Sequence, residues 1–81
     1  MTQDDVALLR RSIDKVVRLH CTDGEVISAK IDLVDENDGE IVYQMLATNQ
    51  ETKPAYSKAG IDAAYLLRFD EVEWVEQEVQ T

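Results

Sequence analysis

The stretch from residue 15 to residue 46 constrains the fold of this chain more than any other. It holds three segments in which apolar and polar residues alternate, separated by two short turn-forming segments. Alternation with a period of two is typical of half-buried β-strands. Gly24 lies in the first turn, and the second turn spans residues 35–39. The pattern predicts a three-stranded antiparallel meander with strands at 15–21, 26–34 and 40–46.

The same alternation assigns the faces of these strands. The residues expected to face the core from the first two strands are Val17, Leu19, Cys21, Ile27, Ala29, Ile31 and Leu33. The second strand is long for a small domain, and the small side chain of Ala29 marks a place where such a strand would bend. The third strand is largely apolar on both faces, so it is expected to be covered on both sides or to lie at an interface.

A helix is predicted before the meander, at residues 2–12. Thr2 is a suitable N-cap, and Asp5 three residues later completes a form of the capping box. Val6, Leu9 and Ile13 have the spacing of one helical face. We expect this face to pack over one end of the β-structure; the alternative is a helix that binds a partner.

Two further strands are predicted after the meander, at residues 64–69 and 72–76, joined by a very tight link. The segment 47–63 is expected to be a mobile loop anchored by Tyr56. Trp74 shares a predicted face with Val72 and is assigned to the core. The chain is thus expected to be a single all-β domain over residues 1–81, a small five-stranded, strongly bent SH3-like barrel with an N-terminal helix.

The charge of the chain narrows the classes of partner. Seventeen acidic residues against eight basic ones give a net charge of −9, and the excess lies in segments 22–40 and 70–81. Such a surface repels phosphate backbones and anionic membranes. The single cysteine excludes an internal disulfide, and no apolar run is long enough to span a bilayer. We therefore expect a cytoplasmic protein that does not bind membranes.

Three groups of residues are candidate chemical sites, and each has a simpler interpretation. His20 and Cys21 are neighbours in one strand, so their side chains point apart and form neither a nucleophile pair nor a metal site. Asp35-x-Asn37-x-Gly39 resembles a calcium loop, but its glycine is fifth rather than sixth, which favours a solvated turn. The glutamates assigned to the solvent face instead of to acid–base catalysis are Glu71, Glu73 and Glu76. No catalytic residue, cofactor or metal is predicted.

The order of elements resembles the Sm-like (LSm) family of small SH3-like barrels. The residues that stand at the positions of its first motif are Gly24, Ala29, Ile31 and Asp35. The run Leu-Arg-Phe-Asp-Glu-Val-Glu-Trp-Val at 67–75 lies on the second motif without a gap. The resemblance covers residues 3–76, and it implies the barrel.

The chain departs from the family at the residues that hold RNA. Where RNA-binding members carry an asparagine in the first motif and Arg-Gly-Asn in the second, this chain has Gly39 and Arg68-Phe69-Asp70. A glycine has no side chain to bond a base. Phe69 replaces the glycine that allows RNA to approach the backbone closely in the family, and the Asp70 carboxylate repels phosphate. The resemblance therefore does not imply the RNA site.

These observations lead to a non-enzymatic binding or assembly module that acts through protein–protein contacts, possibly as a homo-oligomer. The resemblance implies that the fourth strand of one subunit pairs with the fifth of the next. The expected interface residues are Leu66, Arg68, Phe69, Val72, Trp74 and Val75. The alternative is an RNA-binding protein that uses Arg68, Lys53 and Lys58 with Arg10 and Arg11, against which the net charge of −9 argues. A small enzyme or cation-binding protein is the third hypothesis.

Overall fold

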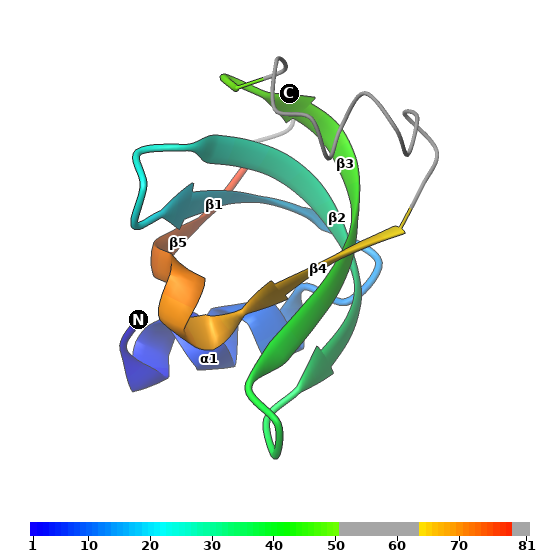
Figure 1. The fold of residues 1–81 in the computed structure, drawn as a ribbon. Helices are drawn as coiled ribbons and strands as arrows, with labels where there is room; N and C mark the ends of the chain where they lie inside the picture. The colour runs from blue at the N-terminus through cyan, green and yellow to red at the C-terminus, as the bar shows by residue number, and fades with distance from the viewer. Residues whose placement is uncertain (51–63, 79–81) are drawn as a thin grey trace.

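The computed structural model describes residues 1–50 and 64–78, and it contains an N-terminal helix followed by five antiparallel strands, as predicted (Figure 1). The elements are α1 (Gln3–Arg11), β1 (Val16–Cys21), β2 (Val26–Asp35), β3 (Glu40–Thr48), β4 (Ala64–Arg68), the single 3-10 turn η1 (Phe69–Glu71) and β5 (Val72–Gln77). The described helix is too short to cross a membrane.

The strands form one sheet in the order β4-β3-β2-β1-β5. β2 and β3 are long and bent, so the sheet curls around a single core, and α1 lies across one end of it (Figure 1). The helix contacts β5 and β2. The buried apolar residues are Leu9, Val17, Leu19, Cys21, Ile27, Ala29, Ile31, Ile41, Tyr43, Met45, Val72 and Val75.

β3 runs two residues further than predicted. Thr48 pairs with Ile27 of β2, and its hydroxyl donates a hydrogen bond to the buried carboxylate of Glu25. These two contacts extend the ladder into the start of the segment predicted as a loop. The predicted mobility of that segment and the role of Tyr56 concern residues 51–63, which lie outside the described residues.

A β-bulge in β2 reverses the predicted orientation of Leu33. The register shifts between Ile31, which pairs with Tyr43, and Leu33, which pairs with Val42. The extra residue between them moves Leu33 from the core face to the outer face. Ile31 is fully buried, whereas Leu33 is 55% exposed. The prediction that Leu33 faces the core is therefore wrong.

A second irregularity has the same effect in β5. His20 pairs with Trp74, and the next residue, Cys21, pairs with Val72, so Glu73 is the extra residue. Val72 consequently faces the core, whereas Trp74 faces outward and is 42% exposed. The prediction of a buried Trp74 is wrong, because it assumed strict alternation through a bulge.

Local rules account for α1 and its ends. The hydroxyl of Thr2 accepts a hydrogen bond from the Asp5 N–H, and the Asp5 carboxylate accepts one from the Thr2 N–H, so the predicted capping box is present. Leu9 is fully buried against the barrel. Ile13 lies beyond the last helical residue and is 38% exposed, so its assignment to the helical face is wrong.

Both predicted glycine turns have the backbone that glycine favours. The φ angle is +89° at Gly24 and +67° at Gly39. In the second turn the Asp35 carboxylate accepts hydrogen bonds from the N–H groups of Asn37 and Asp38. Asp35 therefore stabilises the turn itself, as such side chains commonly do.

Candidate self-association interface

The sheet ends in two strands that are each paired on one side. β4 pairs with β3, and β5 pairs with β1. Within residues 1–50 and 64–78, the other side of each strand has no strand beside it. Edge strands present N–H and C=O groups that a further strand can bond. These are also the two strands that the resemblance places at a subunit interface.

The open edge of β4 carries the backbone of Leu66 and Arg68. The Phe69 N–H donates to the Gly39 C=O at 2.8 Å, so it faces β3. Backbone groups alternate in direction along an antiparallel strand, so those of Leu67 also face β3 and those of Leu66 and Arg68 face the open edge. The side chain of Leu66 lies outside the barrel and is 54% exposed.

Two other predicted interface residues at this end of β4, Arg68 and Phe69, have side-chain contacts within the chain. The Arg68 Nε lies 3.6 Å from an Asp70 carboxylate oxygen, and both side chains are exposed. This contact is a surface ion pair, and it contributes less than about 1 kcal/mol to stability. Phe69 packs against the core, with its ring 3.7 Å from where a Cβ would lie at Gly39. Among the predicted interface residues at this end of β4, Leu66 and Arg68 are therefore the accessible ones.

The outer face of β5 carries a cluster that is centred on Trp74. The indole ring stacks on His20 of β1, with centroids 3.8 Å apart and planes 7° apart. His20 Nε2 lies 2.8 Å from a Glu76 carboxylate oxygen, and the same oxygen lies 3.4 Å from Arg18 Nη1. His20 and Arg18 thus hold Glu76 beside the exposed indole.

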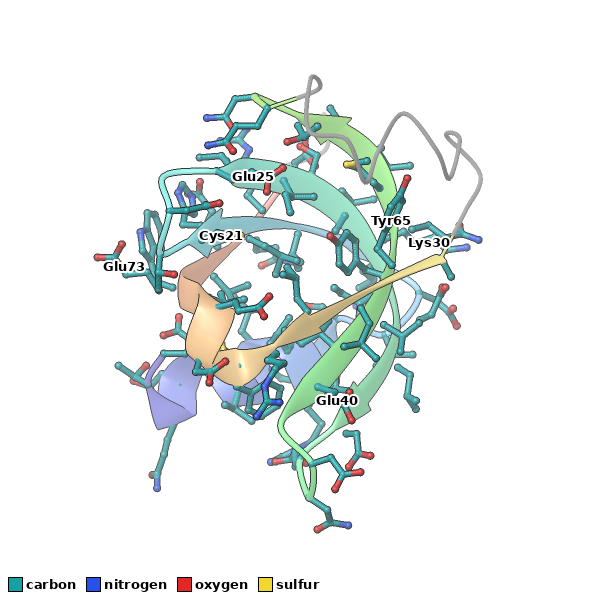
Figure 2. The ribbon with its side chains drawn as sticks, in the orientation of Figure 1. Cys21, Glu25, Lys30, Glu40, Tyr65 and Glu73 are labelled. Carbon is teal, nitrogen blue, oxygen red and sulfur yellow. The ribbon has the colours of Figure 1, made fainter. Side chains whose placement is uncertain are left out.

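Glu76 is held in its ionised form. The hydrogen bond from His20 lowers its pKa, burial opposes this, and the charges of His20 and Arg18 lower the pKa further, so that it lies below its usual value. Figure 2 shows that Glu73, the bulged residue of the same strand, points away from the barrel. The β5 edge is therefore aromatic and anionic.

The remaining predicted interface residues, Val72 and Val75, have their side chains in the core. Val72 is 1% exposed and Val75 is 5% exposed. Both side chains are thus covered within the barrel. The predicted interface set divides into exposed Leu66, Arg68 and Trp74, and residues that hold the strands in place.

The edge of β5 is already contacted at one point by α1. The Cys21 N–H donates to the Glu25 C=O, so the backbone groups of Cys21 face the β2 side of β1. Because backbone groups alternate in direction along an antiparallel strand, those of His20 face β5, where His20 pairs with Trp74. The backbone of Val75, the next residue of β5, then faces the open edge. Its N–H donates to Asp5 Oδ1 at 3.1 Å. Asp5 thus bonds an edge amide 70 residues away in sequence.

Two of the residues proposed for RNA contact, Arg10 and Arg68, form ion pairs in the described part of the chain. Lys53 and Lys58 lie outside it. Arg68 is paired with Asp70, and the Arg10 guanidinium bonds the Glu36 carboxylate. In residues 1–50 and 64–78, Arg10 and Arg68 therefore each have an acidic partner, which reduces the positive charge that they present to a phosphate.

Within residues 1–50 and 64–78, two groups of potential metal ligands lie at the turns. The ligand atoms within each group are within 4.8 Å of one another, and the groups are Cys21, Asp23 and Glu25, and Asp35, Asp38 and Glu40. In both, the first aspartate in sequence accepts a hydrogen bond from a backbone N–H of its own turn: Asp23 from Glu25, and Asp35 from Asn37. This arrangement is that of hydrogen-bonded turns with acidic side chains.

Three residues of this surface have contacts that the sequence did not predict: His20, Glu76 and Asp5. The stacking partner of Trp74 follows from the strand register, which the alternation of single strands does not give. Asp5 was identified only as a capping residue. Its second carboxylate oxygen reaches β5 because the helix packs there, and nothing in the local sequence signals that contact.

Comparison with solved structures identifies the fold. The structure is similar to the crystal structure of the SmAP (LSm) protein from Methanococcus vannielii, with a TM-score of 0.67 and 17% sequence identity over 93% of this chain and 96% of that chain. No family model matches the sequence, and no curated protein matches it. The likeness shows an Sm-like fold, as the sequence resemblance predicted.

Proposed function

We propose that this chain is a non-enzymatic assembly module that associates with copies of itself, the β4 edge of one copy pairing with the β5 edge of the next. The supporting observation is that the two open edges carry complementary side chains. β4 presents apolar Leu66 and basic Arg68 outward, and β5 presents aromatic Trp74 and anionic Glu76. Pairing unlike edges of identical copies is a head-to-tail contact, which closes into a ring when the rotation permits.

Pairing at these edges satisfies backbone and side chains together. A strand added to an edge completes its open N–H and C=O groups. Side chains on the same face of neighbouring strands lie about 4.5–5.5 Å apart and stabilise a sheet by roughly 0.2–1 kcal/mol per pair. Burial of Leu66 and the indole of Trp74 adds a hydrophobic contribution. An 81-residue chain has a small core of its own, so such an interface adds a large share of its stability.

The size and chemistry of the chain support an assembly role over catalysis. In the described residues, the open edge of β4 presents backbone N–H and C=O groups, the apolar side chain of Leu66 and the ion-paired Arg68. Groups of this kind favour pairing with a strand of a protein. As part of the proposal we place the module in the cytoplasm, supported by the presence of one cysteine in the sequence.

The test is sedimentation of the purified chain over a range of concentrations. We expect a discrete species whose mass is a multiple of 9.2 kDa. Leu66→Glu places a charge at the β4 edge and should give monomers. Leu33→Glu is the matched control, because Leu33 is 55% exposed against 54% for Leu66 but lies on β2, away from both edges.

Two results would contradict this function. One is a monomer at every concentration. The other is equal disruption by Leu33→Glu and Leu66→Glu, which would show that added negative charge, and not the edge, controls association. A monomer would direct attention to an extended segment of another protein as the occupant of the edge.

RNA binding is the second candidate function, and the observation that favours it is the Sm-like fold together with Arg68 at the matching position of the motif. It is tested by the affinity for a single-stranded oligonucleotide as a function of salt. A salt-dependent affinity that falls in Arg68→Ala would support it. The net charge of −9 predicts weak binding instead.

A further inference from the structure

The start of α1 is bound to the edge strand that the proposed assembly needs. Asp5 Oδ1 accepts the Val75 N–H at 3.1 Å, while Asp5 Oδ2 accepts the Thr2 N–H and hydroxyl at 2.8 and 2.9 Å. One carboxylate therefore closes the capping box of the helix and covers an outward-facing amide of β5. Both oxygens have partners, so the contact is part of the packing of the helix and not a chance approach.

The covered amide lies at the centre of the edge. Val75 is the fourth of the six residues of β5, and its N–H is directed away from β1. A strand from a second copy would have to supply a C=O at the place where the Asp5 carboxylate now lies. The helix contacts β5, and Asp5 in its first turn is the residue that reaches this amide.

We propose that Asp5 is a latch on the β5 edge, so that the first turn of α1 must release the Val75 N–H before a second copy pairs there. The inference rests on the proposed self-association. It assigns to the chain a built-in control of that step: the free protomer has its β5 edge protected and its β4 edge open. Natural proteins protect edge strands against unwanted pairing in this way, by covering them.

The latch sets the concentration at which copies associate. A hydrogen bond to a charged group is stronger than one between two neutral groups. A strand that replaces this bond must first overcome it. Removing the carboxylate should therefore lower the dissociation constant of self-association by about tenfold or more.

The experiment compares Asp5→Ala with Asp4→Ala. Asp4 is the neighbouring acid in the same first turn, and it is exposed. Its replacement removes the same charge from the same helix end without touching β5. The dissociation constant is measured by sedimentation and by the anisotropy of labelled chain diluted to nanomolar concentrations. We expect tighter self-association for Asp5→Ala and an unchanged constant for Asp4→Ala.

Two further measurements separate release of the edge from loss of folding. Amide exchange of Val75 in the monomer should be faster in Asp5→Ala than in the unmodified chain, and it should become slow again on association. Adding Leu66→Glu to Asp5→Ala should return the protein to monomers, because association of a merely unfolded helix would not depend on the β4 edge.

The outcomes distinguish this inference from the function on which it rests. Monomers for both the unmodified chain and Asp5→Ala would contradict self-association itself. Oligomers that dissociate in Leu66→Glu, with Asp5→Ala no tighter than Asp4→Ala, would leave the assembly standing and overturn the latch. Weaker association of Asp5→Ala would also overturn it, since it would show that the Asp5 contact supports the paired state.

Discussion

His20 and Trp74 lie opposite each other on β1 and β5 and stack with ring centroids 3.8 Å apart. Stacked aromatic pairs contribute about 0.5–1.5 kcal/mol beyond their buried area, so His20→Ala should lower the free energy of unfolding by about 1 kcal/mol or more. Arg18→Ala is the control, because Arg18 also contacts Glu76 but is exposed, and it should cost less. Urea unfolding followed by circular dichroism measures both; equal losses would contradict a role for the stack.

The bulge in β2 gives two neighbouring apolar positions opposite roles. Ile31 is fully buried, whereas Leu33 is 55% exposed. Ile31→Ala should lower the free energy of unfolding by about 2–5 kcal/mol, because it leaves a cavity in the core. Leu33→Ala should change it by about 0.5 kcal/mol or less. Thermal and urea unfolding of the two variants check this, and similar losses at both positions would mean that the register shift is absent in solution.

Asp5 should make stability depend on pH in the acid range. Burial raises its pKa, but hydrogen bonds from the Thr2 and Val75 N–H groups and the Thr2 hydroxyl outweigh this, so the pKa lies below its usual value. The folded state therefore binds a proton less readily than the unfolded state. The stabilisation is present at neutral pH and is lost as the pH falls below about 4, through the Asp5 pKa.

Asp5→Asn isolates this contribution from those of the other acids. The difference in unfolding midpoint between the unmodified chain and Asp5→Asn should be constant near neutral pH and should shrink as the pH falls through the Asp5 pKa. Urea midpoints at a series of pH values, at a protein concentration where both are monomers, give the curve. A difference that grows toward acid pH would have the wrong sign and would refute the assignment.

Gly39 should resist substitution because of its backbone. Its φ angle is +67°, while the Phe69 ring lies 3.7 Å from where a Cβ would be, which is an ordinary contact. Gly39→Ala should therefore lower the free energy of unfolding by about 1–2 kcal/mol through strain alone, and Gly39→Asn should lower it less, because asparagine tolerates this conformation better. Thermal unfolding compares the two; a larger loss for Asn would point to crowding against Phe69 instead.

Much of the fold could be read from local patterns. The period-two alternation of 15–46 located three strands, because a strand with one buried face must alternate. The glycine turns and the Thr2–Asp5 capping box involve residues close in sequence, and the structure contains them. The Sm-like resemblance at 67–75 rested on the same local order, and the structural similarity to an LSm protein agrees with it.

The candidate site depended on relations between strands. A bulge is an extra residue of one strand relative to its partner, so no single strand reveals it. Bulges decided that Leu33 and Trp74 face solvent, because each shift by one residue exchanges the faces of a strand. The bond from Val75 to Asp5 joins residues 70 apart and exists only because α1 packs beside β5. Local sequence was sufficient for the strands and turns, whereas pairing register and helix docking decided which side chains reach the edges.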